Sequence, residues 1–235
     1  ENTMAAFELA IQQGADGIEL DVQRTADGVL VVCHDEEILR LTCQNGSIAG
    51  MTFEQLRRLN FAAHMPDASP QRLPALADVL DLVRPTGLTI DIELKNATVL
   101  CPGLEDDVLR LLIEWKMTER VQLASFNHYS LVECIRLIRE MNLSIPCGPQ
   151  YFCGFFEPWH YAVRNGFAAI HPLYANLRIP GLVTRCHDAG IAVNAWTIDQ
   201  PEHIAMAVQL GVDAVITNVP DQAIQIRNTL SYPSA

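Results

Sequence analysis

The chain has 235 residues, with 16 basic and 28 acidic side chains and a formal net charge of −12 at pH 7. A protein this acidic is poorly suited to grip nucleic acid or an anionic membrane through its overall charge. Hydrophobic residues make up 49% of the chain and charged residues 19%, which is typical of a folded globular protein and excludes a disordered one.

The chain begins with a predicted helix followed by two short strands. Residues 2–13 form the helix, for which Asn2 is a suitable N-cap and Gly14 a C-terminal stop. Residues 17–23 form the first strand. Residues 29–34 form the second, after a tight turn that contains glycine.

An irregular insertion comes next. Residues from about 35 to 74 are rich in turn-forming glycine and proline. One short helix is predicted inside them, at residues 52–59, with Thr52 as its cap. After the insertion we expect a helix, a strand and a helix, at residues 76–83, 88–94 and 104–115.

Strands and helices alternate through the second half of the chain. The strands begin near residues 121, 144, 168, 191 and 213, and the helices cover residues 130–141, 157–165, 180–189 and 201–210. A spacing of roughly 22–24 residues suits one strand and one helix per unit. Regular alternation indicates an α/β fold with a parallel sheet, and the lack of a reversal favours a barrel.

The sequence contains seven barrel-type strands, whereas a complete (β/α)₈ TIM barrel has eight. Because the chain opens with a helix, we expect the missing strand to precede Glu1. We therefore predict one domain over residues 1–235. It is a (β/α)₈ TIM barrel with its first strand missing from this chain and an inserted subdomain at about residues 35–74, after the second strand.

The strand at residues 17–23 carries two carboxylates on one face. Because strand side chains alternate, Glu19 and Asp21 point the same way. Both faces of a parallel barrel strand are normally apolar, so two inward carboxylates repel each other unless a cation compensates them. Such oxygen ligands suit Mg²⁺ or Ca²⁺. The alternative is an edge strand with one face in water.

The strand at residues 88–94 repeats this pattern. Asp91, Glu93 and Lys95 share one face. A lysine here suits a phosphate contact or a salt bridge to the carboxylates. Two strands with inward carboxylates favour a metal site, and the carboxyl ends of barrel strands are where active sites lie.

Two further candidates lie at strand ends. His34 follows an apolar strand and is close in sequence to the first carboxylates, which makes it a candidate general acid or base. The alternative is a structural histidine bonded to Asp35 or to a backbone carbonyl. Trp196 ends the strand that begins near residue 191, where it would either wall a ligand pocket or pack in the core.

Several segments together resemble the glycerophosphodiester phosphodiesterase family. They are the E-N-T start, the E-x-D and H-D elements, the I-E-L-K strand end, the N-A-W-T-I-D segment and the closing G-V-D-A-V-I-T-N-V-P. The resemblance covers nearly the whole chain. It implies a (β/α)₈ barrel and metal-dependent hydrolysis of glycerophosphodiesters to an alcohol and sn-glycerol 3-phosphate.

The resemblance also implies catalytic roles. Glu19, Asp21 and Glu93 correspond to three ligands of a divalent metal, Mg²⁺ or Ca²⁺. His34 corresponds to the second of two catalytic histidines. The first lies in an H-R-G element just before E-N-T in the family, and this sequence starts at E-N-T. His34 alone could supply only one of two proton transfers.

Three residues correspond to contacts with the substrate. Lys95 matches a residue near the substrate phosphate, and Trp196 matches a wall of the glycerol pocket. Glu1 matches the glutamate of E-N-T, which lies close to the site in the family.

Two other functions stay open. The aromatic loop at residues 151–156 would suit a phospholipase D-like barrel acting on lysophospholipid or sphingomyelin. A non-catalytic barrel that binds a phosphate ligand or a protein partner is the other alternative, because the first histidine lies outside this sequence.

Partners and location follow from composition. We expect a small-molecule glycerophosphodiester substrate, no nucleic acid, and no stable membrane insertion, since no apolar run approaches a membrane span. A homo-oligomer is left open. The seven cysteines are odd in number and form no C-x-x-C motif, which favours a reducing, cytoplasmic location.

Overall fold

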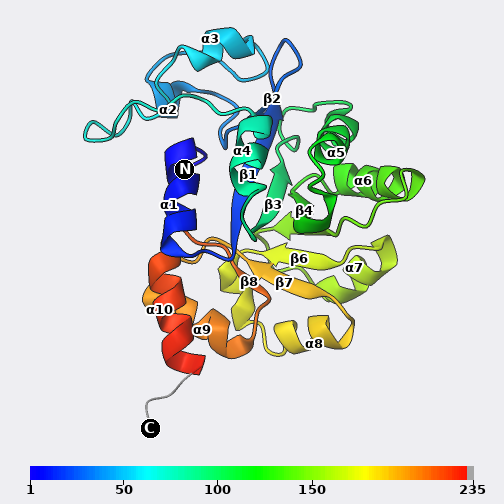
Figure 1. The fold of residues 1–235 in the computed structure, drawn as a ribbon. Helices are drawn as coiled ribbons and strands as arrows, with labels where there is room; N and C mark the ends of the chain where they lie inside the picture. The colour runs from blue at the N-terminus through cyan, green and yellow to red at the C-terminus, as the bar shows by residue number, and fades with distance from the viewer. Residues whose placement is uncertain (232–235) are drawn as a thin grey trace.

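The computed structural model describes residues 1–231 and shows a curled sheet with helices on its outer face (Figure 1). The strands run in the order β2-β1-β3-β4-β5-β6-β7-β8. Their bounds are β1 Gly17–Arg24, β2 Leu30–Val32, β3 Thr89–Leu94, β4 Val121–Ser125, β5 Cys147–Tyr151, β6 Ala169–Pro172, β7 Ala192–Ala195 and β8 Ala214–Val215. The last four residues of the predicted domain lie outside the described residues.

The helices connect these strands. They are α1 Met4–Gln13, α2 Leu39–Thr42, α3 Phe53–Arg57, α4 Leu76–Val83, α5 Leu104–Glu114, α6 His128–Glu140, α7 Pro158–Asn165, α8 Leu182–Asp188, α9 Pro201–Leu210 and α10 Pro220–Ser231, with short 3₁₀ turns at Thr118–Arg120 and Tyr174–Arg178. Eight of these helices were predicted, and α4 and α9 have the predicted bounds. Helices α2 and α10 were not predicted. No helix within residues 1–231 is long and apolar enough to cross a bilayer.

Seven strands of the sheet are parallel, as predicted, and β2 pairs with β1 in the antiparallel sense. The fold is therefore TIM-barrel-like. Among the described residues β8 and β1 are the ends of the parallel run and do not pair with each other. A cleft of about 940 Å³ lies along this opening between β8 and β1. It is lined by parts of α1, β1, β8, α9 and α10.

Buried apolar side chains hold β1 and β3 against the helices that cover them. Apolar residues of β1 and β3 that point outward, such as Leu20 and Ile92, are fully buried beneath helices. On α5, Leu104, Val108 and Leu112 are also fully buried. This packing fixes β1 against β3, which is where the candidate site lies.

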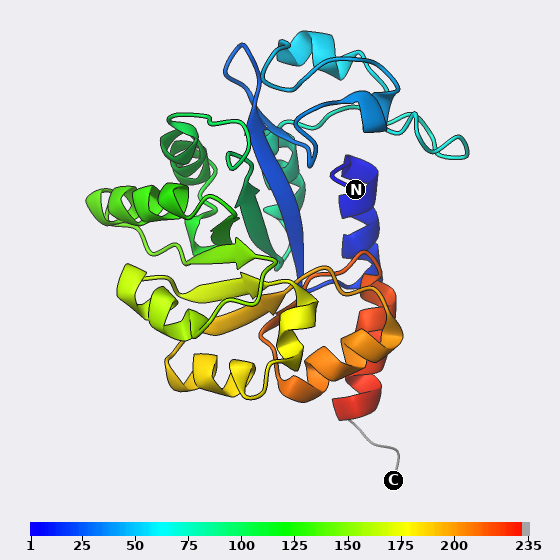
Figure 2. The same cartoon turned by 180° about the vertical axis from the view of Figure 1, so that it is seen from behind.

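The insertion between β2 and α4 projects beyond the carboxyl end of β1 (Figures 1 and 2). It has a small buried cluster of its own, in which Ile38, Ile48 and Leu56 are fully buried. Thr52 caps α3 as predicted, and its side chain accepts a hydrogen bond from the Gln55 backbone N–H.

Several helix starts differ from the prediction by one or two residues, and two of them are informative. Thr3, not Asn2, caps α1, and its hydroxyl accepts from the Ala6 backbone N–H at 3.2 Å. Asn2 has a left-handed backbone with φ of 52°, which turns its side chain toward β1 instead. Helix α8 begins after Gly181 and not at Pro180.

Candidate active site

The carboxylates of β1 and β3 come together because the two strands are adjacent. In the parallel register Glu19 lies opposite Asp91, and Asp21 lies opposite Glu93. Side-chain alternation then points all four into the barrel. Oxygen atoms of Glu19, Asp21 and Glu93 all lie within 4.8 Å of one another. The predicted trio therefore forms one cluster.

The cluster has a high density of negative charge in a poorly solvated place. Asp21 and Glu93 are buried and Glu19 is half-buried. Burial raises the pKa of Glu19 well above its ordinary value, and the neighbouring carboxylates Asp21 and Asp91 raise it further. Burial and then Asp21 raise the pKa of Glu93 in the same way.

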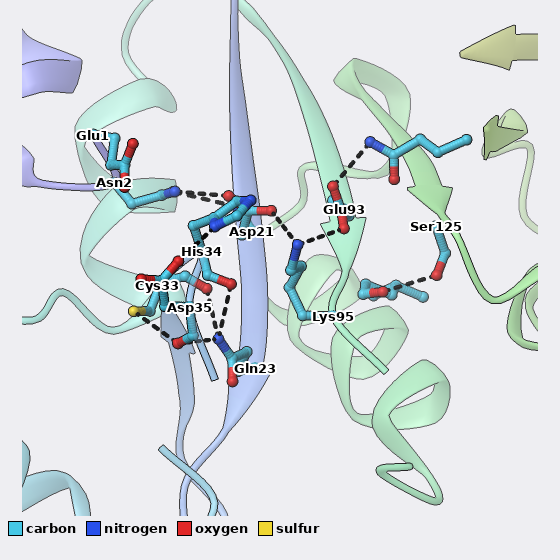
Figure 3. Close-up of polar contacts among 12 residues, drawn as sticks. Glu1, Asn2, Asp21, Gln23, Cys33, His34, Asp35, Glu93, Lys95 and Ser125 are labelled. Carbon is cyan, nitrogen blue, oxygen red and sulfur yellow. Dashed lines mark hydrogen bonds and ion pairs between the residues drawn. The ribbon is translucent and has the colours of Figure 1, made fainter. Parts of the chain in front are cut away.

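One cation partly compensates this charge. The Lys95 ammonium lies 2.9 Å from Glu93 Oε1 and 3.5 Å from Asp21 Oδ1 (Figure 3). Burial alone would lower the pKa of Lys95, but the two carboxylates outweigh it and the pKa is raised. One ammonium against three carboxylates leaves a net negative site.

Two amides orient the cluster from either side (Figure 3). Asn2 Nδ2 donates to Asp21 Oδ2 at 2.7 Å, and the Asp21 backbone N–H donates back to Asn2 Oδ1 at 3.3 Å. Gln150 Nε2 on β5 donates to Glu93 Oε2 at 2.9 Å. Both carboxylates are therefore held in fixed orientations before any ligand binds.

His34 lies beside the cluster on the turn after β2. Gln23 holds this turn, since its Nε2 donates to the carbonyls of Cys33 at 2.8 Å and Asp35 at 2.9 Å. His34 Nδ1 lies 2.8 Å from Asp35 Oδ1, so Nε2 is the ring nitrogen left to face a ligand. His34, Glu19 and Asp21 line the same cleft.

Arg40 of the insertion ties this turn to the chain start. Its guanidinium donates to Asp35 at 2.5 Å and also to Glu1. These bonds lower the pKa of Asp35, and in Glu1 they outweigh burial, so its pKa is also lowered. Glu1 therefore lies at the mouth of the site as an ion-paired carboxylate.

Trp196 is on the other side of the mouth, after β7. Its indole N–H donates to the His171 carbonyl at 2.8 Å. Its ring meets that of Phe126 edge-on, with centroids 5.4 Å apart. Trp196 is half-buried, so it is neither a fully buried core residue nor fully exposed.

The residues that hold the site in place were not predicted as part of it. Asn2, Gln23, Arg40 and Gln150 are ordinary polar residues in the sequence, and only the three-dimensional contacts give them a role. Asp91 lies opposite Glu19 among the inward carboxylates, as expected. Its Oδ2 also lies 2.9 Å from Nε2 of His171, a fully buried histidine on β6 that was not predicted as its partner.

Comparisons with known proteins point to one family. Residues 1–222 match the profile of the Glycerophosphoryl diester phosphodiesterase family. A glycerophosphodiester phosphodiesterase of Caldanaerobacter subterraneus subsp. tengcongensis is 39% identical over 227 residues, which cover 96% of this chain and 91% of that protein.

Solved structures share the fold. A glycerophosphodiester phosphodiesterase from Agrobacterium tumefaciens superposes with a TM-score of 0.81 at 26% identity, covering 96% of this chain and 93% of that one. A phosphodiesterase from Oleispira antarctica, solved in complex with its product sn-glycerol-3-phosphate, superposes with a TM-score of 0.82 at 23% identity, covering 97% and 91%.

Proposed function

The chain belongs to the glycerophosphoryl diester phosphodiesterase family, and from this premise we propose that it hydrolyses glycerophosphodiesters to an alcohol and sn-glycerol 3-phosphate with the help of a divalent cation. The observation that carries the proposal is the clustering of Glu19, Asp21 and Glu93 within 4.8 Å. Glu19 and Asp21 lie on a cleft that His34 also lines.

The donor set suits a hard divalent cation. All three residues offer carboxylate oxygens, which Mg²⁺ and Ca²⁺ prefer. Asp21 Oδ1 is buried and has no hydrogen-bond partner among the described residues, its one recorded contact being the Lys95 ammonium at 3.5 Å, which leaves it able to coordinate a cation. A bound Mg²⁺ or Ca²⁺ would supply Lewis acidity toward the phosphate oxygens.

His34 is proposed as one of the two proton-transfer groups. Asp35 accepts from its Nδ1 side, and Arg40 fixes Asp35. In the neutral ring this arrangement places the lone pair on Nε2, which can then take a proton or, once protonated, give it back. The second group is proposed to come from an H-R-G element on a strand that fills the opening between β8 and β1.

The remaining residues are proposed to bind the substrate. Lys95, already among the carboxylates, is within reach of a phosphate oxygen held at the cluster. Trp196 offers an apolar wall for the glycerol carbons. Glu1, paired with Arg40, closes the side of the mouth nearest the insertion.

The proposal is tested by measuring sn-glycerol 3-phosphate release from glycerophosphocholine. The assay uses a protein extended before Glu1 by a strand that contains an H-R-G element, and the 235-residue chain is assayed in parallel. We expect release with Mg²⁺ or Ca²⁺, loss of release in EDTA, and much slower release from the 235-residue chain, which has His34 alone. No release with either ion, or undiminished release in EDTA, would contradict metal-dependent hydrolysis. Binding of glycerol 3-phosphate without turnover would favour the non-catalytic alternative.

A further inference from the structure

A buried network of hydrogen bonds begins at the residue after Lys95. Its members are Asn96, Glu105 and Ser130, which we call the polar triad, and all three are buried. The Asn96 amide donates to Glu105 Oε1 at 3.0 Å and to Ser130 Oγ at 2.8 Å. The Ser130 hydroxyl donates to the same Glu105 oxygen. The three side chains therefore form a closed triangle.

The polar triad joins three elements of the fold. Asn96 is the second residue after β3, Glu105 lies in the first turn of α5, and Ser130 lies in the first turn of α6. The Asn127 amide, at the start of α6, also donates to the Asn96 carbonyl at 3.1 Å. The chain that leaves β3 is therefore fixed to the starts of both helices.

The main chain at Lys95 is held from both sides. The Lys95 backbone N–H donates to the Val22 carbonyl of β1 at 3.0 Å, and the Asn96 N–H donates back to the Leu94 carbonyl at 3.1 Å. The Ser125 hydroxyl of β4 donates to the same Leu94 carbonyl at 2.8 Å. Lys95 is therefore in a tight turn, and the position of this turn decides where its side chain can reach.

The buried carboxylate of Glu105 accepts from neutral donors, an amide and a hydroxyl. A buried carboxylate is costly when no cation pairs with it, and apolar packing would often be at least as stable. A hydrogen bond to a charged acceptor is stronger than one between neutral groups. Glu105 therefore holds the Asn96 amide, and with it the turn after β3, more firmly than a neutral acceptor would.

We propose that the polar triad positions Lys95 for the substrate phosphate. The inference rests on the proposed function. The three residues act through the turn after β3, which keeps the Lys95 ammonium 2.9 Å from Glu93 Oε1 and 3.5 Å from Asp21 Oδ1. They are positioning residues, and Lys95 is the group that meets the ligand.

A displaced Lys95 has opposite consequences for two ligands of the site. Its ammonium attracts a phosphate and repels a divalent cation. When the ammonium moves away from the carboxylates, glycerol 3-phosphate should bind more weakly and Ca²⁺ should bind more tightly. General damage to the fold would weaken the binding of both ligands. The two signs therefore separate positioning of Lys95 from a merely structural role.

The test is calorimetry on the 235-residue chain, with Ca²⁺ alone and with glycerol 3-phosphate in saturating Ca²⁺. Asn96→Leu removes both amide donors and leaves the net charge unchanged. We expect glycerol 3-phosphate to bind about tenfold more weakly and Ca²⁺ about threefold more tightly. Ser130→Ala removes one donor and should shift both dissociation constants in the same directions by less.

A charge-conserving exchange should restore the network. The double substitution of Asn96→Asp with Glu105→Gln swaps the carboxylate and the amide, so the same bonds can form with donor and acceptor reversed. Both dissociation constants should return close to those of the unsubstituted protein. In a Lys95→Met background, which should itself show both shifts, Asn96→Leu should add nothing further.

The control variant is Asn165→Leu, which makes the same change at the end of α7. This asparagine is half-buried, and its amide donates to the Tyr161 carbonyl at 2.8 Å. The substitution should leave both dissociation constants unchanged.

The outcomes separate the inference from the proposed function. If the unsubstituted protein binds both ligands and Asn96→Leu weakens both or changes neither, the inference is overturned and the proposed function stands. Shifts that persist in the Lys95→Met background, or that the exchange does not reverse, also overturn it. If Asn96→Leu does not fold, the signs seen with Ser130→Ala decide. Failure of the unsubstituted protein to bind either ligand overturns both the inference and the proposed function.

Discussion

The carboxyl ends of β1, β2 and β3 carry charged and amide side chains, whereas those of β4, β5 and β7 carry an aromatic patch, which we define as Phe126, Phe152 and Trp196. In the ionic half two of the clustered carboxylates have partners that fix them: Asn2 for Asp21, and Gln150 with Lys95 for Glu93. In the aromatic half, ring contacts and one indole hydrogen bond do this.

This difference separates two properties of the site, its chemistry and its affinity for a ligand. Buried charge is costly unless it is paired, so the ionic half is built around a fixed arrangement that chemistry can use. Aromatic surface needs no such pairing and tolerates exposure at modest cost. We therefore expect substitutions in the ionic half to change catalysis and metal binding, and substitutions in the aromatic half to change ligand affinity or stability.

The largest effect is expected at His34, on the ionic half. His34→Asn keeps a polar side chain but cannot exchange a proton, so kcat for glycerophosphocholine should fall about 10²–10⁴-fold. Metal binding should stay unchanged because the carboxylate cluster is intact. The same substitution at the exposed His160 is the control. A variant that keeps more than about a tenth of the original kcat would make His34 structural.

The next effect is expected at a proposed metal ligand. Glu93→Gln removes one negative charge from the cluster at nearly constant shape, and Ca²⁺ or Mg²⁺ affinity should fall at least about 100-fold, with turnover falling alongside it. Glu133→Gln, which breaks an exposed ion pair with Arg136 on α6, should change neither quantity. Unaltered metal affinity by calorimetry would show that Glu93 is no ligand.

A smaller effect concerns pH and the stability of the metal-free protein. Glu19 and Glu93 have raised pKa values in the folded state relative to an ordinary value of 4.5. Between that value and the raised ones the folded protein binds more protons than the unfolded chain does. The free energy of unfolding contributed by these groups is therefore full at low pH and falls as pH rises through this window.

Thermal unfolding in EDTA at about pH 5 and about pH 8 measures this dependence. The pair of substitutions Glu19→Gln and Glu93→Gln should flatten it. Saturating Ca²⁺ should raise the melting temperature most at the higher pH, where the cluster is ionised. If the melting temperature of the metal-free protein changes with pH by the same amount with and without the two glutamates, these groups do not cause the pH dependence.

The smallest effect is expected in the aromatic half. Trp196→Phe keeps an aromatic ring but removes the indole N–H that donates to the His171 carbonyl. The free energy of unfolding should fall by about 1 kcal/mol, or roughly 2–4 °C in melting temperature. The kcat for glycerophosphocholine should change far less than in His34→Asn. A loss of kcat of comparable size would remove the distinction between the two halves.

Local geometry was enough to predict several helix bounds and the faces of the strand side chains from the sequence alone. Strand side chains alternate with a period of two, so an E-x-D segment and a D-I-E segment must each place their carboxylates on one face. The bounds of α4 and α9 and the cap of α3 also followed from neighbouring residues. The trio Glu19, Asp21 and Glu93 was predicted by this reasoning and by family resemblance.

Tertiary structure decided what holds these residues. Asn2 looked like a helix cap, but the adjacent Thr3 took that role and left Asn2 free to reach Asp21, 19 residues away in sequence. Gln150 reaches Glu93 across 57 residues. Such contacts depend on which strands are neighbours and in what register, and those are set by packing of the whole sheet.

The same reason explains the aromatic patch. Phe126, Phe152 and Trp196 are far apart in the chain and share no spacing that local rules could interpret. They meet because parallel strands bring their carboxyl ends to one side of the sheet. The sequence by itself determined which residues could do chemistry on each strand. The arrangement of the strands in the curled sheet decided which of these residues act together, because it brings the carboxyl ends of separate strands within contact distance.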